Sequence, residues 1–205
     1  MPLHLDDVET VTDLRVFLER AERLGSSSTR LQTFGTVLAV TIPVLSPRGL
    51  GDPTPLIIAM RTSAIQPTEP VDTVVAIRSI LERIARFAPG AGGSLEWPPT
   101  TLTEAWAGIA PPIGEWEVLS DVTIPSLQLA AERTLAQLAS VTTTQPEQVL
   151  AAALSAHDAE LGVPAGLPAV AQSLGFLIGE APARLSRNGR WSRLTTNHGH
   201  VLSRA

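Results

Sequence analysis

Near the C-terminus, arginine side chains alternate with a tryptophan in a pattern suited to binding negative charge. Residues 181–205 hold five arginines and no acidic residue, so this stretch carries a charge of +5. Planar guanidinium groups grip phosphate through paired hydrogen bonds, and an indole ring stacks on a base or on a cation. The candidate binding residues are Arg184, Arg187, Arg190, Trp191 and Arg193.

The same arginines have an alternative use inside the chain. Residues 94–180 hold one arginine against ten acidic residues, a net charge of −9. Opposite charges on one chain attract each other without any ligand. We favour the interpretation in which Trp191 packs on its own domain while the arginines reach the acidic residues Glu115, Glu117 and Asp121, and we keep ligand binding as the second option.

The residues between these arginines predict the element that positions them. Asn188-Gly189 between two strand-like runs is typical of a two-residue hairpin turn, in which both central residues have a positive φ. This turn sets Arg187 opposite Arg190 at its tip. Alternation along the two strands then defines one face with Arg184, Ser186, Trp191 and Arg193 and another with Leu185 and Leu194.

The sequence offers few groups for catalysis or metal binding. It holds neither cysteine nor lysine, which excludes thiolate zinc sites, thiol nucleophiles and Schiff-base lysines. No glycine-rich phosphate loop or nucleophile elbow is present. His198 and His200 alternate near the terminus and are the candidate metal ligands, but such a pair is usually without function. We therefore predict no catalytic residue, no metal site and no cofactor.

Helical and strand patterns predict an α+β fold with a small antiparallel sheet packed by helices. Apolar residues at helical spacing predict an amphipathic helix at 13–24, and Asp72 is expected to cap a second helix. Aliphatic runs at 29–45 and 56–65 predict two strands. Residues 95–122, rich in tryptophan and proline, are expected to be irregular. Further helices are predicted at 125–140, 144–161 and 167–174, the second of them opened by a capping box at Thr144.

Composition suggests a division of the chain and a location in the cell. The glycine-rich break at 89–94 predicts an α+β domain over 1–93 and a helical domain with the basic hairpin over 94–205, although the two could pack as one unit. No apolar run approaches the ~20 residues that cross a bilayer. Acidic residues stand near the N-terminus where a secretory signal would be basic and apolar. We expect a cytoplasmic protein without membrane contact.

Motifs at both ends of the chain resemble a group of actinobacterial proteins. They are the early pairs Asp13-Leu14 and Phe17-Leu18, the run Gly175-Phe176-Leu177 and the stretch RNGRWSRL at 187–194. The resemblance implies a cytoplasmic protein of actinobacterial origin. It implies no particular activity, substrate or cofactor.

The order of elements after residue 144 also resembles a winged helix, whose second helix enters the major groove while a hairpin contacts the DNA backbone. The residues fit this role poorly. The expected recognition helix at 166–174 offers only Gln172 and Ser173 to read base edges and has no arginine. The net charge of −5 also opposes nucleic-acid binding. Winged helices that serve dimerisation or protein contacts fit this apolar helix better.

These observations favour a non-enzymatic interaction or assembly protein. Its basic hairpin would contact an acidic surface, either on another copy in a homo-oligomer or on a partner protein. The alternative is a winged-helix-like regulator that contacts nucleic acid through the hairpin tip. A third hypothesis is an enzyme with a pocket in the tryptophan- and proline-rich segment, for which the spacing places no paired carboxylates and no nucleophile with a base.

Overall fold

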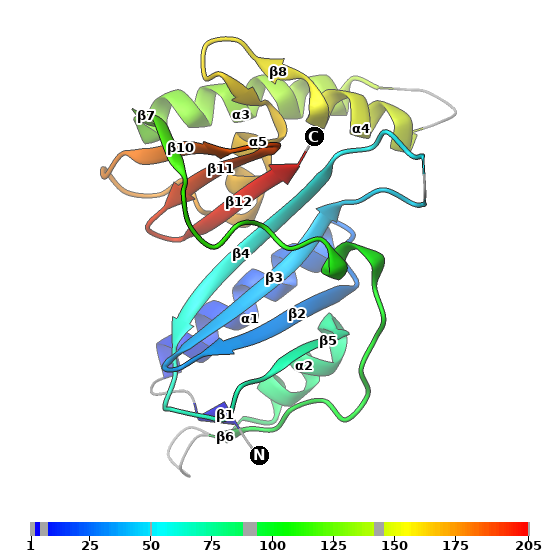
Figure 1. The fold of residues 1–205 in the computed structure, drawn as a ribbon, viewed down its shortest axis with the longest axis vertical. Coiled ribbons are helices and arrows are strands. Elements are labelled where there is room, and N and C mark those ends of the chain that lie inside the picture. Colours follow the sequence, from blue (N-terminus) through cyan, green and yellow to red (C-terminus); the bar gives the residue numbers. More distant parts are fainter. Residues whose placement is uncertain (1–2, 5–7, 50, 88–93, 142–145, 205) are drawn as a thin grey trace. The chain divides into compact units, whose positions relative to one another are not determined.

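The computed structural model describes residues 3–4, 8–49, 51–87, 94–141 and 146–204. The chain divides into two compact units, each built from two separate stretches. The first unit comprises Met1–Pro43 and Met60–Ile109, and the second comprises Val44–Ala59 and Ala110–Ala205. Figure 1 shows the elements of both units with their labels.

The first unit combines two helices with antiparallel strands, and the helices lie on one face of the strands (Figure 1). Two of its strands, β3 and β4, run on into the second unit. The elements in chain order are β1 (Leu3–His4), α1 (Val8–Arg23), β2 (Ser28–Phe34), β3 (Val37–Leu45), β4 (Leu56–Ala64), β5 (Asp72–Ala76), α2 (Ile77–Ala85), β6 (Ser94–Leu95) and the 3₁₀ turn η1 (Ala105–Gly108).

The helix α1 forms because its apolar residues recur at helical spacing, so that one face can be buried. Its buried residues are Val11, Leu14, Phe17, Leu18 and Ala21. This confirms the helix predicted at 13–24. The helix begins five residues earlier than expected, at Val8, and the Thr12 hydroxyl donates to the carbonyl of Val8 within its first turn.

Two predictions about the first unit are wrong in detail. The run 29–45 holds two strands, because Gly35, with a φ of +61°, allows a tight turn that pairs Phe34 with Val37. Asp72 caps no helix, since it opens β5 and pairs with Gln32 of β2. The helix α2 starts five residues later, at Ile77. The strand predicted at 56–65 is confirmed as β4.

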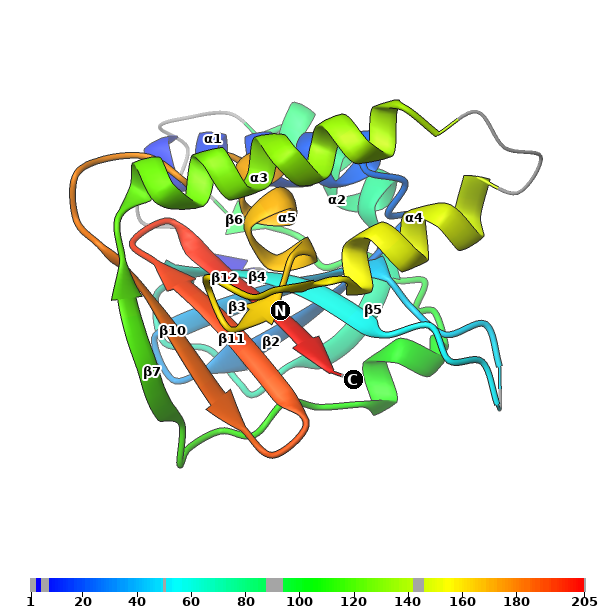
Figure 2. The same ribbon diagram turned by 90° about the horizontal axis from the view of Figure 1, so that it is seen from above.

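The second unit places helices against a strand meander. The helix α5 lies between α3 and the strands (Figure 2), which explains why nearly all of its side chains are buried. Its elements are β7 (Glu117–Val122), α3 (Ile124–Ala139), α4 (Pro146–Ser155), β8 (His157–Asp158), β9 (Val163–Pro164), α5 (Gly166–Leu174), β10 (Ala183–Asn188), β11 (Trp191–Thr196) and β12 (Gly199–Arg204).

The predicted helices of the second unit are present, with one shortened. The helix α3 matches the prediction at 125–140, and Thr123 caps it by accepting from the backbone N–H of Ser126. The helix α5 ends as expected at Gly175, which has a φ of 75°. The helix α4 stops at Ser155, because His157 and Asp158 form β8 instead. The capping box at Thr144 lies outside the described residues.

Eight strands follow the hydrogen-bonded order β5-β2-β3-β4-β12-β11-β10-β7. Each unit repeats one pattern. A helix precedes a three-stranded meander, β2-β3-β4 in one unit and β10-β11-β12 in the other, and a further strand pairs with the first strand of each meander.

The predicted fold class is therefore wrong, both in its small sheet and in its winged-helix-like end. A third strand, β12, follows the predicted hairpin, and β7 arises from the segment expected to be irregular. The supposed recognition helix α5 is buried over most of its surface, and only Gln172 and Ser173 are partly exposed. The sequence hides this result because these pairings join residues far apart in the chain, as in the match of Val122 with Ala183.

Candidate interaction surface

The hairpin of the second unit is the element that carries the candidate arginines. It turns at Gly189-Arg190, with Asn188 paired to Trp191 and Leu185 paired to Leu194. The prediction set Arg187 opposite Arg190, so the turn lies one residue later than predicted and each residue of β10 pairs with a residue two positions further along β11. Only Gly189 of the two loop residues has a positive φ, as in hairpin turns that take glycine at their first position.

This shift leaves the two faces of the hairpin as predicted. Ser186 and Arg193 are paired on one face, while Leu185 and Leu194 are paired on the other. The leucine face is completely buried. The face with Ser186 also holds Trp191, which is only 6% exposed.

Two of the candidate arginines are engaged by their own chain. The Arg184 guanidinium donates to Asp121 of β7, with 2.9 Å between Nε and Oδ1. This hydrogen bond raises the pKa of Arg184 and lowers the pKa of Asp121. Arg187 donates to the backbone carbonyl of Gly162 at 2.9 Å. Whether these residues bind a partner stays a prediction, because their observed partners are internal.

Arg190 and Arg193 differ from the other two. Arg190 is exposed at the hairpin tip and makes no hydrogen bond or ion pair within the described residues. Arg193 lies under the ring of Trp116, with its Cζ atom 4.1 Å from the ring centroid, a cation–π contact. Its pKa is lowered because partial burial removes water from the guanidinium.

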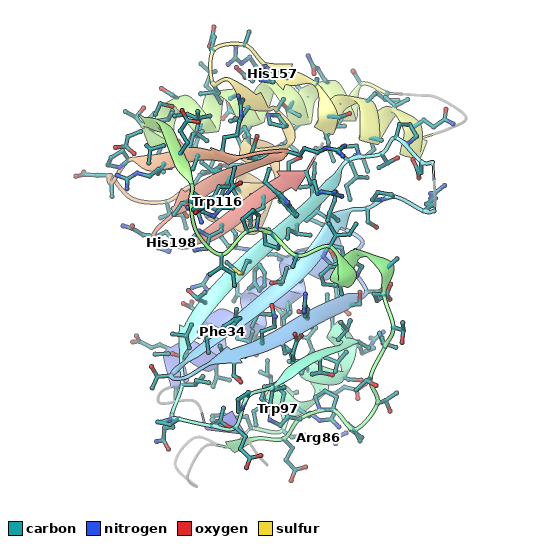
Figure 3. All side chains as sticks on the ribbon, viewed as in Figure 1. Phe34, Arg86, Trp97, Trp116, His157 and His198 are labelled. Carbon is teal, nitrogen blue, oxygen red and sulfur yellow. The ribbon has the colours of Figure 1, made fainter. Side chains whose placement is uncertain are left out.

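A short strap, residues 112–116, covers this part of the second unit. The side-chain amide of Asn188 donates to the carbonyls of Gly114 and Glu115, at 2.9 and 3.1 Å. The indole N–H of Trp116, labelled in Figure 3 beside the strands β10 to β12, donates to the carbonyl of Pro112. These bonds hold Glu115 at a φ of 59°, a conformation that non-glycine residues rarely adopt. The strap thereby leads the chain into β7.

The strand β7 is the last in the strand order and pairs with β10 alone. Its register contains a bulge at Leu119, because Ser120 pairs with Leu185 and Val118 with the next residue, Ser186. Val118 is 53% exposed and Leu119 is 37% exposed. An edge strand presents unpaired backbone groups, so β7 offers both hydrogen-bonding groups and apolar side chains to another chain.

The two candidate metal-ligating histidines have structural contacts instead. The backbone N–H of His198 donates to the hydroxyl of Thr196, and Nδ1 of His200 lies 3.1 Å from the hydroxyl of Thr195. Among the residues that the structure describes, no group of three or more metal-binding side chains gathers. Burial, assisted by the charge of Arg193, lowers the pKa of His200.

The lowered pKa of His200 predicts acid sensitivity. The unfolded chain takes up a proton near pH 6.5 and the folded one only at lower pH, so stability is complete above pH 6.5 and falls as the pH drops. We expect the slope to reach at most about 1.4 kcal/mol per pH unit. Urea unfolding at several pH values should show this loss in the wild type and a weaker loss in His200→Gln, whereas equal slopes would contradict the assignment.

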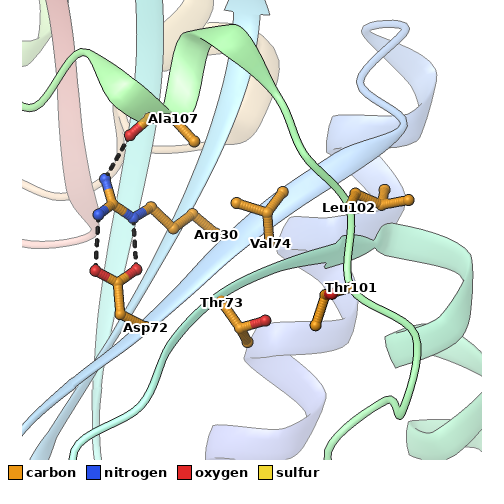
Figure 4. A pocket seen from close by; sticks show the side chains of 7 residues that line it. All are labelled: Arg30, Asp72, Thr73, Val74, Thr101, Leu102 and Ala107. Atoms are coloured by element: carbon orange, nitrogen blue, oxygen red, sulfur yellow. Dashed lines mark hydrogen bonds and ion pairs between the residues drawn. The ribbon is translucent and has the colours of Figure 1, made fainter.

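The first unit contains a shallow hollow of about 330 Å³, shown in Figure 4. Both donor positions of the Arg30 fork are bound to Asp72, each at 2.7 Å, and its remaining nitrogen donates to the carbonyl of Ala107 at 2.8 Å. The ion pair raises the pKa of Arg30 and lowers that of Asp72. Since these groups satisfy one another, the pair serves to tie η1 to β2 and leaves little charge for a ligand.

The outer edge of β5 is also partly covered. The backbone N–H of Leu102 donates to the carbonyl of Val74 at 2.7 Å, so the segment at 101–102 lies along this strand. The hollow lies beside this segment, with Thr73 and Thr101 in its lining.

The features that stand out most in the second unit were not predicted from the residue types. Neither β7 nor the strap leading into it was expected, because proline and tryptophan indicated irregular chain. The one available signal was the run Glu117–Val122, where three aliphatic residues occur among polar ones. Ser186 was assigned to the correct face, but its burial without a partner depends on tertiary packing.

Two families match the chain, one for each half. The family described as "Domain of unknown function (DUF8010)" matches residues 1–108, which is more than half of the chain. The chain belongs to the DUF8010 family. Residues 111–205 of this DUF8010 protein match a second family, "Domain of unknown function (DUF8185)". These matches confirm the prediction that the chain belongs to a family of unknown function. The actinobacterial origin stays a prediction.

No match was found among curated protein sequences. Among solved structures, the DUF8010 protein resembles sliding clamps. The DNA polymerase sliding clamp from Caulobacter crescentus is 13% identical with a TM-score of 0.56, and the chain is covered over 100% of its length and spans 65% of the clamp. A Helicobacter pylori beta clamp bound to a DNA ligase peptide is 10% identical with a TM-score of 0.55, and the match covers 100% of this chain and 65% of that clamp. A Pseudomonas aeruginosa DNA polymerase sliding clamp is 12% identical with a TM-score of 0.56, and the match covers 95% of this chain and 62% of that clamp.

At these identities the likeness establishes the fold alone. The DUF8010 protein thus has the fold of the sliding clamps and spans about 65% of the length of the clamps it matches. This result replaces the winged-helix-like fold class. Within the described residues, the helices are too short or too polar to cross a membrane.

Proposed function

We propose that this protein is a non-enzymatic assembly protein of the sliding-clamp fold, whose copies pair through the free edge of β7. The observation that carries the proposal is the position of β7 at the end of the strand order, with Val118 and Leu119 exposed. Unpaired strand edges recruit further strands, and exposed apolar side chains favour burial in a contact.

A second copy of this chain is the partner that fits this edge. In an antiparallel pair of two β7 strands that sets Leu119 against Ser120, Val118 faces Asp121 and Glu117 faces Val122. No acidic residue then stands opposite another acidic residue, which would be destabilising. The strand is therefore compatible with a two-fold symmetric contact, the commonest arrangement of homo-oligomers.

The basic hairpin supports this role in two ways. Arg184 binds Asp121 and thereby fixes β7 against β10. Arg190 remains at the exposed tip, so it is the arginine best placed to contact an acidic surface of a partner protein. We propose a cytoplasmic location for this assembly.

Contact with nucleic acid is the second candidate function. The likeness to proteins described as DNA polymerase sliding clamps favours it. The net charge of −5 and the internal engagement of Arg184 and Arg187 oppose it. The likeness to a beta clamp bound to a DNA ligase peptide supports protein contacts more directly.

The test of the assembly is the mass of the protein in solution. We expect the wild-type chain to sediment at twice its 21.7 kDa mass at micromolar concentration. Val118→Lys places a charge in the apolar contact and should weaken the association at least about tenfold, since a buried unpaired charge costs more than 1.4 kcal/mol.

A matched control separates this effect from general solubility. Leu129→Lys introduces the same charge at a residue of α3 that is 57% exposed, close to the exposure of Val118, and should leave the mass unchanged. A wild-type protein that remains a monomer at tens of micromolar would refute the proposal, as would an equal effect of the two substitutions.

A further inference from the structure

Two buried polar atoms without hydrogen-bond partners belong to paired residues on neighbouring strands of the second unit. Ser186 of β10 and Arg193 of β11 are register partners, so their side chains leave the same face of the strands about 5 Å apart. Ser186 is 0% exposed, and its hydroxyl has no hydrogen-bond partner. The Nε atom of Arg193 is also buried without a partner.

Such a pair of atoms requires a physical explanation, because buried polar groups are almost always hydrogen-bonded. Arginine stays charged in proteins, so the donors of Arg193 stay donors at any ordinary pH. Within the described residues this guanidinium makes no hydrogen bond or ion pair, and the ring of Trp116 lies against it. A ring attracts the cation through its face and accepts none of the N–H bonds that lie in the guanidinium plane.

The charges around the pair leave a positive excess. Arg193 has Leu202 as its register partner on β12, and Ser186 has Val118 as its partner on β7, so neither neighbour supplies an acceptor. His200 is close enough to Arg193 for the two charges to interact, and its lowered pKa keeps it neutral at pH 7. The acid on this face, Asp121, is already bound by Arg184.

The strap holds this arrangement in place before any ligand arrives. Trp116 is fixed by its bond to Pro112, and the strap is fixed by the two bonds from Asn188. With one face of the guanidinium covered by the ring, an acceptor must approach along its edge, where Nε lies, and Ser186 is the neighbour across the strands on the same face. Donors fixed in this way bind without the cost of first being ordered.

We propose that Arg193 and Ser186, covered by Trp116, form a binding site for an oxyanion, either a carboxylate or a phosphate group. The N–H groups at the edge of Arg193 donate to one or two oxygens of the ligand, and the Ser186 hydroxyl donates to another. Arginine is suited to both groups because its fork matches the spacing of their oxygens. The site does not depend on the assembly proposed above.

The experiment titrates the full chain with inorganic phosphate and, separately, with acetate, at pH 7.5 and constant ionic strength maintained with chloride. Trp116 reports the binding, since a ligand on Arg193 alters the charge beneath its ring, and tryptophan fluorescence is the readout. We expect a saturable change with at least one anion. Arg193→Gln should weaken it at least about tenfold, and Ser186→Ala should weaken it by about three- to tenfold.

The matched control is Arg78→Gln, which removes the same charge from an exposed position of α2 in the first unit and should leave the titration unchanged. If Arg193→Gln is poorly folded by circular dichroism, Arg193→Lys keeps the charge, loses the fork and should still weaken binding. Saturation by phosphate alone identifies a phosphate-bearing ligand, and saturation by acetate identifies a carboxylate. An absence of saturation up to about 100 mM, or equal binding in wild type and Arg193→Gln, would overturn the proposal and leave water as the occupant.

Discussion

Gly199→Ala is expected to destabilise the protein by about 3 kcal/mol, more than a typical substitution. Gly199 opens β12 at a φ of +154°, and a Cβ atom there would lie 2.5 to 2.9 Å from three ring atoms of Phe176. That ring is completely buried and cannot move aside without displacing its neighbours. For a chain of this length the cost corresponds to a fall in Tm of about 6–12 °C, measured by circular dichroism.

Gly189→Ala is the control for this substitution. Gly189 also has a positive φ, of +53°, but a Cβ atom there would meet nothing within 4 Å. Only the backbone cost remains, about 1–2 kcal/mol. Equal losses at the two positions would show that the Phe176 ring does not constrain residue 199.

Phe17→Ala is expected to destabilise the first unit by about 3–5 kcal/mol. Phe17 is 1% exposed and lies on the buried face of α1, beside Leu14, Leu18 and Ala21. Removal of its ring loses the favourable free energy of transferring a large apolar group out of water. It also leaves a cavity that the surrounding aliphatic side chains only partly fill. The loss is read as a lower midpoint in guanidinium unfolding followed by circular dichroism.

Phe34→Ala removes the same atoms from the same unit. Phe34 is 59% exposed at the end of β2, where Figure 3 labels it, and its loss should change stability by less than about 0.5 kcal/mol. A comparable effect at both positions would mean that the burial of Phe17 is not what stabilises α1.

The helices could be predicted from the sequence because their signal is local. In α1, α3 and α5 the apolar spacing and the terminal residues, such as Gly175 after Leu174, lie within one stretch of chain. The strand order could not be predicted in this way. The pairing of β7 with β10 joins residues about 60 positions apart, and no local pattern specifies the partner of a strand.

The candidate site was predicted in part, for the same reason. Asn188-Gly189 indicated a hairpin correctly, and alternation placed Ser186 and Arg193 on one face. The cross-strand pairing was wrong by two residues, because a two-residue turn can take glycine at its first position, as observed, or at its second, as predicted. The contact of Arg193 with Trp116 bridges 77 positions of the chain and depends on a strap that composition alone does not indicate.

The bond from Leu102 to Val74 makes the two ends of the strand order chemically unequal. A sheet with two open margins can add molecules end to end without limit, which is the route to fibres. Here the edge of β5 is partly occupied by residues of its own chain. The free edge of β7 therefore pairs better with the β7 of another copy than with β5. In the proposed pair the β7 edges of both copies are used, so no β7 edge remains to extend the assembly.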